Sequence, residues 1–324
     1  MPLPAPPSMF GDPGVRQIYE QNKPKRDRGM LEFTGSTIWT GTIDLLPLGE
    51  LIIALNYHGL QIFAADDLSE PVREIPLLHG YYSDNLHLDG DYLYVGRSHY
   101  LHIFDISNPD KFKQMSVTDV GGDFMEIEKQ GDNLFLGGIV HNWGGTDSPM
   151  LFIYDVSDVE QPQLVSSYTH WIPLFDCRRF AIVGDYLYGV SGVIGHLVTF
   201  DISDLEDPVL LPAYALGDSA WDIVYKDGFL YTISDAGLYT YEVTGPGIPT
   251  YRDVLATTGN WSLEIYNDVL IADHTYGIRF FAIDPPNPLQ QIGVYDWDGG
   301  WYNMAISDDK LYAPACLQGF RILD

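Results

Sequence analysis

Histidine recurs at one place in a repeating pattern along this 324-residue chain. Five of the nine histidines lie between one short apolar run and the next: His58, His99, His141, His196 and His274. Imidazole changes charge near neutral pH and can act as a general acid or base, and its neutral form binds metal ions. We therefore expect histidines from different repeats to gather on one face of the protein.

A second recurring position carries polar side chains at the start of an apolar run. Its occupants are Asn85, Glu126, Arg179, Asp222, Ser262 and Asn303, with Asp44 near the same place in the first repeat. An apolar residue would suffice there in a purely structural repeat. We expect these side chains and the histidines to converge on one spot, which suits a divalent metal ion or an acid–base pair.

Two assignments of this chemistry stay open. A divalent ion such as Zn, Ca or Mg would be held by imidazoles and carboxylates, with one position open for water or substrate. The candidate metal ligands are His99, His274, Glu126 and Asp222. Without a metal, a catalytic set of base, acid and cation would act on a carboxylate or enolate. The candidates for that set are His58, His141, Arg179 and Tyr57, with Tyr276 as a second tyrosine.

Each of these groups also has a structural interpretation. A histidine in a tight loop can bond a backbone carbonyl group. Glu126 and Asp222 can satisfy backbone N–H groups at the mouth of a channel, and Arg179 can form an ion pair with Glu126. These alternatives predict a loss of stability, rather than a specific loss of activity, when the residues are replaced.

Two consecutive loops depart from the repeat. GGIVHNWGGTDSPM precedes the run that starts at Leu151, and THWIPLFDCRR leads into the next repeat; both are longer than their counterparts. Added loop on a regular scaffold often carries binding residues, and a neutral insertion is the alternative. We expect Trp143 and Trp171 to cover a small-molecule or carbohydrate ligand that Asn85 and Asn303 also contact.

The elements that must position these residues are short strands. The stretch from Leu197 to Leu238 contains apolar runs separated by Asp-Pro, Gly-Asp and Asp-Gly, which predicts four strands and no helix. Its pattern recurs with two landmarks per copy. The first landmark is at Leu51, Leu93, Leu134, Leu187, Leu230, Leu270 and Leu311. The second is at Leu60, Leu101, Leu151, Leu197, Leu238, Ile278 and Phe320.

These copies predict an all-β, seven-bladed β-propeller of four-stranded blades. The last copy ends at Asp324 after its second landmark, so it lacks an outermost strand, and a strand near Met30 to Phe33 is expected to complete it. Closure of this kind removes exposed sheet edges. We expect residues 1–27 to form an N-terminal arm and residues 28–324 to form a single propeller domain.

Three runs identify a family resemblance. LHIFDISNP at Leu101 to Pro109, LFIYDVSD at Leu151 to Asp158 and LVTFDISD at Leu197 to Asp204 resemble the LVIVD-repeat propellers of bacteria and archaea. The resemblance implies the fold, and an exported or cell-surface form, but it says almost nothing about chemistry, because the motifs occupy packed strands and turns.

Composition narrows the function. A formal net charge of −28 excludes generic nucleic-acid binding, which needs a basic surface. The sequence contains neither an apolar run long enough to span a membrane nor the pattern of a signal peptide at its start. It also lacks the glycine-rich motifs of nucleotide-binding proteins, so no nucleotide cofactor is expected. Acidic residues concentrate in turns, where aspartate bonds neighbouring N–H groups.

Two classes of function follow. The first is an enzyme whose site lies at the channel mouth, a lyase, isomerase or hydrolase that works by acid–base chemistry with or without a metal. The second is a non-catalytic binding or scaffold propeller at a cell surface. An enzyme should have a deep pocket with converging histidine and carboxylate groups, whereas a scaffold should present a broad and shallow surface. The sequence leaves the oligomeric state open.

Overall fold

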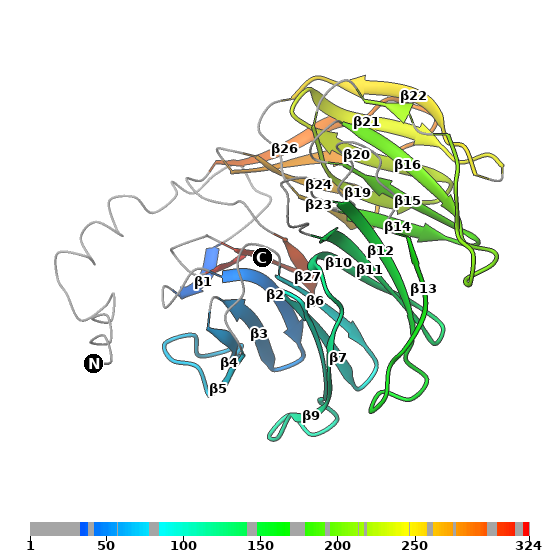
Figure 1. Cartoon of the computed structure of the whole chain (residues 1–324). Coiled ribbons are helices and arrows are strands. Elements are labelled where there is room, and N and C mark those ends of the chain that lie inside the picture. The colour runs from blue at the N-terminus through cyan, green and yellow to red at the C-terminus, as the bar shows by residue number, and fades with distance from the viewer. Residues whose placement is uncertain are drawn as a thin grey trace.

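The computed structural model contains seven antiparallel β-sheets arranged as blades around a central axis (Figure 1). Among the residues that it describes there are strands and turns but no helices. The described residues are 33–37, 42–56, 58–77, 84–140, 148–168, 179–191, 195–212, 214–216, 219–245, 247–257, 262–274, 277–296, 303–314 and 320–323. The predicted fold class, an all-β seven-bladed propeller, is confirmed.

Each of the first three blades is a meander of four strands that runs from the axis outward. Blade 1 consists of β2 (Thr42–Leu48), β3 (Leu51–Asn56), β4 (Gly59–Ala64) and β5 (Arg73–Pro76). Blade 2 consists of β6 (Asp84–Asp89), β7 (Tyr92–Arg97), β8 (Tyr100–Asp105) and β9 (Lys113–Asp119). Blade 3 consists of β10 (Asp123–Gln130), β11 (Asn133–Val140), β12 (Ser148–Asp155) and β13 (Gln163–Tyr168).

The next three blades repeat this order, with the outer strand of blade 4 divided in two. Blade 4 consists of β14 (Arg179–Val183), β15 (Tyr186–Val190), β16 (His196–Asp201), β17 (Val209–Leu210) and β18 (Tyr214–Ala215). Blade 5 consists of β19 (Ala220–Lys226), β20 (Phe229–Ser234), β21 (Gly237–Glu242) and β22 (Thr250–Leu255). Blade 6 consists of β23 (Leu263–Tyr266), β24 (Val269–His274), β25 (Gly277–Ala282) and β26 (Gln290–Asp296).

Blade 7 joins the two ends of the chain. It contains β27 (Ala305–Ser307), β28 (Lys310–Pro314) and β29 (Phe320–Leu323), and β1 (Phe33–Thr37) pairs antiparallel with β29. The first strand of the chain is therefore the outermost strand of the last blade, so the predicted closure is confirmed. The paired segment starts at Phe33, later than expected, and Met30 lies outside the described residues.

The core lies between neighbouring blades. The described residues form seven apolar clusters, and each cluster combines side chains from two adjacent blades. Phe63 of blade 1, for example, packs edge to face against Phe320 of blade 7, with ring centroids 5.6 Å apart. A single blade cannot bury both faces of its own sheet, so the ring must close before every apolar face has a partner.

The acidic turns between third and fourth strands are held by their own side chains. Asp105 Oδ1 accepts hydrogen bonds from the backbone N and the hydroxyl of Ser107, at 2.9 and 2.6 Å. Asp201 and Ser203 repeat this arrangement in blade 4. The serine hydrogen bonds lower the pKa of both aspartates. These acids therefore shape turns, as the structural interpretation predicts. The described residues include no helix that is long and apolar enough to cross a membrane.

Candidate functional site

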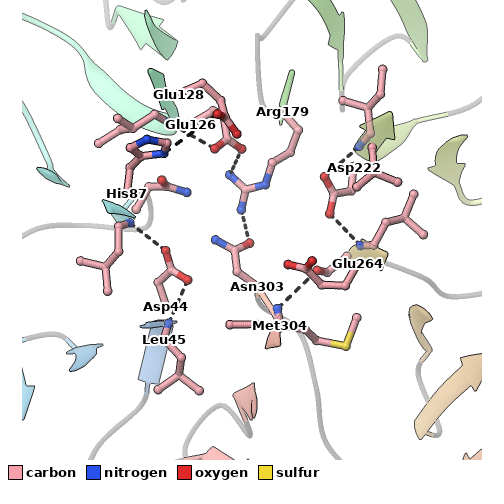
Figure 2. Close-up of a pocket in the computed structure, with 18 of the residues that line it drawn as sticks. Asp44, Leu45, His87, Glu126, Glu128, Arg179, Asp222, Glu264, Asn303 and Met304 are labelled. Atoms are coloured by element: carbon pink, nitrogen blue, oxygen red, sulfur yellow. Dashed lines mark hydrogen bonds and ion pairs between the residues drawn. The ribbon is translucent and has the colours of Figure 1, made fainter. Parts of the chain in front are cut away.

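The first strands of the seven blades surround a cavity of about 310 Å³ on the propeller axis. Side chains alternate along a strand, so residues two apart face the same side. Each inner strand accordingly presents positions two residues apart to the axis, and Figure 2 shows the polar ones around the opening. The first ring of positions contains Asp44, Asn85, Glu126, Arg179, Asp222, Ser262 and Asn303. A second ring, two residues further along, contains Leu46, His87, Glu128, Val224, Glu264 and Ala305.

A local irregularity precedes each carboxylate of the first ring. The pairing of the first two strands shifts register between Thr42 and Asp44 in blade 1, and the same shift recurs before Glu126 in blade 3 and Asp222 in blade 5. A bulge inserts one residue and turns the next side chain away from its regular direction. Asn85 and Arg179 line the same cavity from strands with regular pairing, so the shifts lie beside the carboxylate positions but are not required for a side chain to face the axis.

Asp44 and Asp222 hold adjacent blades together. Asp44 Oδ1 accepts the backbone N–H of Leu45 at 2.8 Å, and its Oδ2 accepts that of Leu86 in blade 2 at 2.7 Å. Asp222 does the same with Ile223 at 2.8 Å and with Leu263 of blade 6 at 2.7 Å. Burial raises the pKa of Asp44 to about 6 against these hydrogen bonds, and it also raises the pKa of Asp222. Both carboxylates serve as cross-blade clasps.

Arg179 lies at the centre of the first ring and is matched by a carboxylate (Figure 2). Its Nη1 atom is 3.0 Å from Glu126 Oε2, and its Nη2 donates a hydrogen bond to Asn303 Oδ1. Burial opposes the charge of the guanidinium, but the nearby carboxylates Glu126, Asp222 and Asp44 raise its pKa overall. The expected ion pair between Arg179 and Glu126 is present, and it neutralises the arginine within the cavity.

The second ring carries titratable groups without such clasps. Burial raises the pKa of Glu264 to about 8, helped by the charges of Asp222 and Asp44. Burial also raises the pKa of Glu128 to about 7, although 42% of its side-chain surface is exposed. His87 Nδ1 lies 4.0 Å from Glu128 Oε2, and burial lowers the pKa of this histidine. Near neutral pH both glutamates therefore retain protons that an ordinary glutamate would have lost, and His87 is neutral.

The cavity contains more acids than bases. Five carboxyl groups line it, from Asp44, Glu126, Glu128, Asp222 and Glu264, against one arginine. Burial raises the pKa of Glu126 well above its ordinary value even though Arg179 opposes this rise. Burial of these carboxyl groups therefore favours their protonated forms.

The structure brings together five of the predicted site residues. Asn85, Glu126, Arg179, Asp222 and Asn303 all line the cavity. They come from blades 2, 3, 4, 5 and 7, so the expected convergence of the polar ring is present in the structure.

Two of the histidines from the second-to-third strand turns, His58 and His99, lie away from the cavity. His58 is exposed, and its backbone N–H donates to Asn56 Oδ1 at 2.8 Å. His99 is 45% exposed, with Nε2 at 3.8 Å from Asp123 Oδ1. Neither residue lines the cavity. His274 ends β24 with only its backbone described, and Tyr57, His141, Trp143, Trp171 and Tyr276 lie outside the described residues.

Part of the long connection in blade 3 is strand. β11 and β12 extend through Val140 and from Ser148, and these two residues pair with each other. The loop is therefore shorter than the sequence pattern indicates, because Ser148 to Met150 continue the ladder. Residues 141–147 and 169–178, which include the rest of both long loops, lie outside the described residues.

The expected metal site stays a prediction. Within the described ranges, no group of three or more His, Cys, Asp and Glu side chains is arranged to hold a metal ion. His141 and the side chain of His274 belong to the undescribed part, and the donors that face the cavity are mainly carboxyl groups already bonded to backbone N–H groups or to arginine.

Sequence reasoning missed His87, Glu128 and Glu264. The signal for them was present in the period of two along a strand: each lies two residues after a member of the first ring. Counting two residues forward from each polar position of the first ring identifies the second ring. His87 was missed because the sequence pattern selects histidines that recur at one position of the repeat, and His87 does not recur.

Comparison with known proteins supports the repeat and the fold. The sequence profile described as the LVIVD repeat matches residues 80–116 and 176–215, so the chain contains LVIVD repeats as its motifs indicated. A search of curated proteins found no match. The crystal structure of the computationally designed Ika8 protein is similar with a TM-score of 0.56 and 9% identity, over 89% of this chain and 99% of that one. At this identity the likeness concerns the fold alone.

Proposed function

We propose that this seven-bladed propeller with LVIVD repeats is an enzyme whose active site is the axial cavity, and that it works by acid–base chemistry as a lyase, isomerase or hydrolase. One observation supports this most strongly. Glu128 and Glu264, with pKa values raised to about 7 and 8, line the same cavity of about 310 Å³. A general acid or base works best when its pKa is near the operating pH, and strongly shifted pKa values concentrate at active sites.

The two glutamates suit different roles. Glu264 is mostly protonated at pH 7 and would act as the acid, whereas Glu128 can accept a proton and would act as the base. His87, 4.0 Å from Glu128, is neutral and could pass a proton between that carboxyl group and the ligand. The Arg179 and Glu126 pair would fix the geometry beside them.

The alternative of a non-catalytic scaffold has weaker support. The carboxyl groups converge in a hollow on the axis, which is the arrangement expected for a reaction site. A scaffold would place its distinctive residues on the outer rim, and the described turns there contain aspartates that shape the turns themselves.

Exchange of carbon-bound hydrogen tests the proposal without knowledge of the reaction. The protein would be incubated in D₂O with pools of small neutral and charged molecules, and ¹H NMR would follow deuterium incorporation and any new signals. We expect one pool to exchange or react with the wild-type protein, and the rate to fall at least 100-fold in E128Q. Equal spectra for wild-type and E128Q protein in every pool would contradict the proposal.

A further inference from the structure

The acceptors of the cavity outnumber its donors once the structural bonds are assigned. Asp44 and Asp222 are occupied by backbone N–H groups, and Glu126 is occupied by Arg179. Among the described residues, Glu128 and Glu264 bond no backbone N–H of a neighbouring blade. Each accepts the backbone N–H of the residue that follows it, and Glu128 also lies 4.0 Å from His87 Nδ1. The groups that are open to a ligand are therefore mainly carboxyl oxygens.

Asn85 adds an acceptor that has no partner. The residue lines the cavity, is only 3% exposed, and its Oδ1 atom is buried without a hydrogen bond. Buried polar atoms are almost always paired, so an unpaired one needs an explanation. A donor bound in the cavity would supply the missing hydrogen bond. This observation is independent of the acidic cluster, because an amide oxygen carries no net charge.

Charge and size restrict the ligand further. An anion would meet five carboxyl groups and a single arginine whose charge Glu126 already matches. A cation would relieve the repulsion among the carboxylates and would donate to the unpaired acceptors. The cavity, at about 310 Å³, is at the lower end of ligand-pocket volumes, so the ligand must be small.

We propose that the axial cavity binds a small organic cation, with a primary ammonium or guanidinium group held between Glu128, Glu264 and the Oδ1 atom of Asn85. This inference rests on the proposed function in one respect, since the cation would then be the substrate of the enzyme. The charged group would donate hydrogen bonds to three blades, 2, 3 and 6, which places it on the axis. The uncharged part of the ligand would extend toward Leu46, Val224 and Ala305, which also line the cavity.

Cation binding must be linked to proton release. The raised pKa values of Glu264 and Glu128 mean that the empty site holds protons at neutral pH, and a bound cation favours the ionised carboxylates. Asp44 and Asp222 add negative charge from two further strands, and Glu126 adds it from the strand that carries Glu128, while Arg179 opposes the cation and His87 is neutral. Affinity should therefore rise with pH until the amine itself loses its proton.

Calorimetry with four-carbon probes tests the inference. The probes are n-butylamine and n-butylguanidine as cations, 1-butanol as the neutral control and butyrate as the anionic control, in phosphate and in HEPES. We expect only the two cations to bind, about ten-fold more tightly at pH 8 than at pH 6, with a heat that differs between buffers because protons are released. Absence of cation binding, or equal binding of 1-butanol or butyrate, would overturn the inference.

Two variants locate the site. E264Q should weaken binding of the cations at least ten-fold and reduce the number of protons released. E206Q, in an exposed turn of blade 4, is the matched control and should bind as the wild-type protein does. Far-UV circular dichroism checks that both variants fold. Proton release is measured on the wild-type protein, so that result does not depend on the folding of any variant. Unchanged binding in folded E264Q would also overturn the inference.

The outcomes separate this inference from the proposed function. Cation binding that depends on Glu264, without exchange or turnover of any cation in the D₂O experiment, would support the inference and contradict the enzyme proposal. Turnover of neutral or anionic molecules by a protein that binds none of the cations would do the reverse.

Discussion

Carboxyl groups in the two rings of the cavity have different roles. Asp44 and Asp222 each bond two backbone N–H groups, one in their own blade and one in the next. Glu128 and Glu264 of the second ring make no such link, and their pKa values are raised to about 7 and 8. The first pair links adjacent blades, and the second pair is the one to which we assign the proposed acid–base chemistry.

Replacing Asp222 with alanine should destabilise the fold. The change leaves the N–H groups of Ile223 and Leu263 without their acceptor, and a buried unsatisfied group costs roughly 1–3 kcal/mol. We expect a fall of about 2 kcal/mol in the free energy of unfolding, measured by urea denaturation. S307A is the control, because Ser307 Oγ contacts the exposed side chain of Asp308 at 3.5 Å and links no blades. Equal stability of D222A and S307A would contradict the role of the clasp.

Stability should fall as pH rises. The pKa of Glu264 is raised from 4.5 to about 8, so the folded state binds more protons than the unfolded state between these pH values. The free energy of unfolding therefore decreases as pH rises across this range. The largest decrease is about 1.4 kcal/mol for each pH unit between the two pKa values. E264Q should flatten the profile in urea denaturation from pH 5 to pH 8. A profile that is identical in the variant would rule out this assignment.

At the scale of the elements, bulges and glycines position the strands. Register shifts mark the inner strands just before Asp44, Glu126 and Asp222. Glycines with positive φ begin the third strands β4 and β21, at Gly59 with φ 137° and Gly237 with φ 150°. A Cβ atom at Gly237 would lie 2.4 Å from the carbonyl oxygen of Leu255, on the neighbouring strand β22. Only glycine lets these two strands approach.

The Gly237→Ala change separates this close approach from backbone strain alone. It combines a positive φ with a clash against backbone, so we expect a loss of more than about 3 kcal/mol in chemical denaturation. Gly90 is the matched control, because its φ is 56° and a Cβ atom there would meet no heavy atom within 4 Å. G90A should cost only about 1–2 kcal/mol. A similar cost for both variants would show that the strand contact is unimportant.

The sequence predicted the fold well because each blade repeats the same landmarks in the same order. Leu101, Leu197 and Leu238, all placed by that pattern, are at most 1% exposed. It predicted the first polar ring because that position also recurs. It did not predict Glu128 or Glu264, since only some blades carry a charged residue there and their pKa values depend on neighbours from other blades. Such convergence is a property of the closed ring and not of any one repeat.

At the scale of the whole molecule, the ring is closed by two strands from opposite ends of the chain. β1 pairs with β29 from Phe33 opposite Leu323 to Thr37 opposite Phe320. Without β1, the backbone of β29 would present an unpaired edge, which invites association with other chains. The closing strand β1 covers blade 7, which packs against blade 1. Phe320 and Ile322 of blade 7 belong to the apolar cluster that these two blades share.

Truncation tests this closure. A chain that starts at residue 38 lacks β1, so we expect a fall of several degrees in melting temperature and self-association in size-exclusion chromatography. A chain that starts at Arg28 keeps β1 and should melt close to the full-length protein. If both truncated chains behaved alike, β1 would not be needed to close the ring.

The central claim is that the axial cavity holds glutamates whose protons are retained at neutral pH. The most direct measurement is a ¹³C NMR titration of the glutamate side-chain carboxyl carbons, with E264Q and E128Q used to assign the two signals. We expect these carbons to titrate with pKa values of about 8 for Glu264 and about 7 for Glu128. Titration of both at the ordinary value for glutamate, near 4.5, would contradict the account of the site.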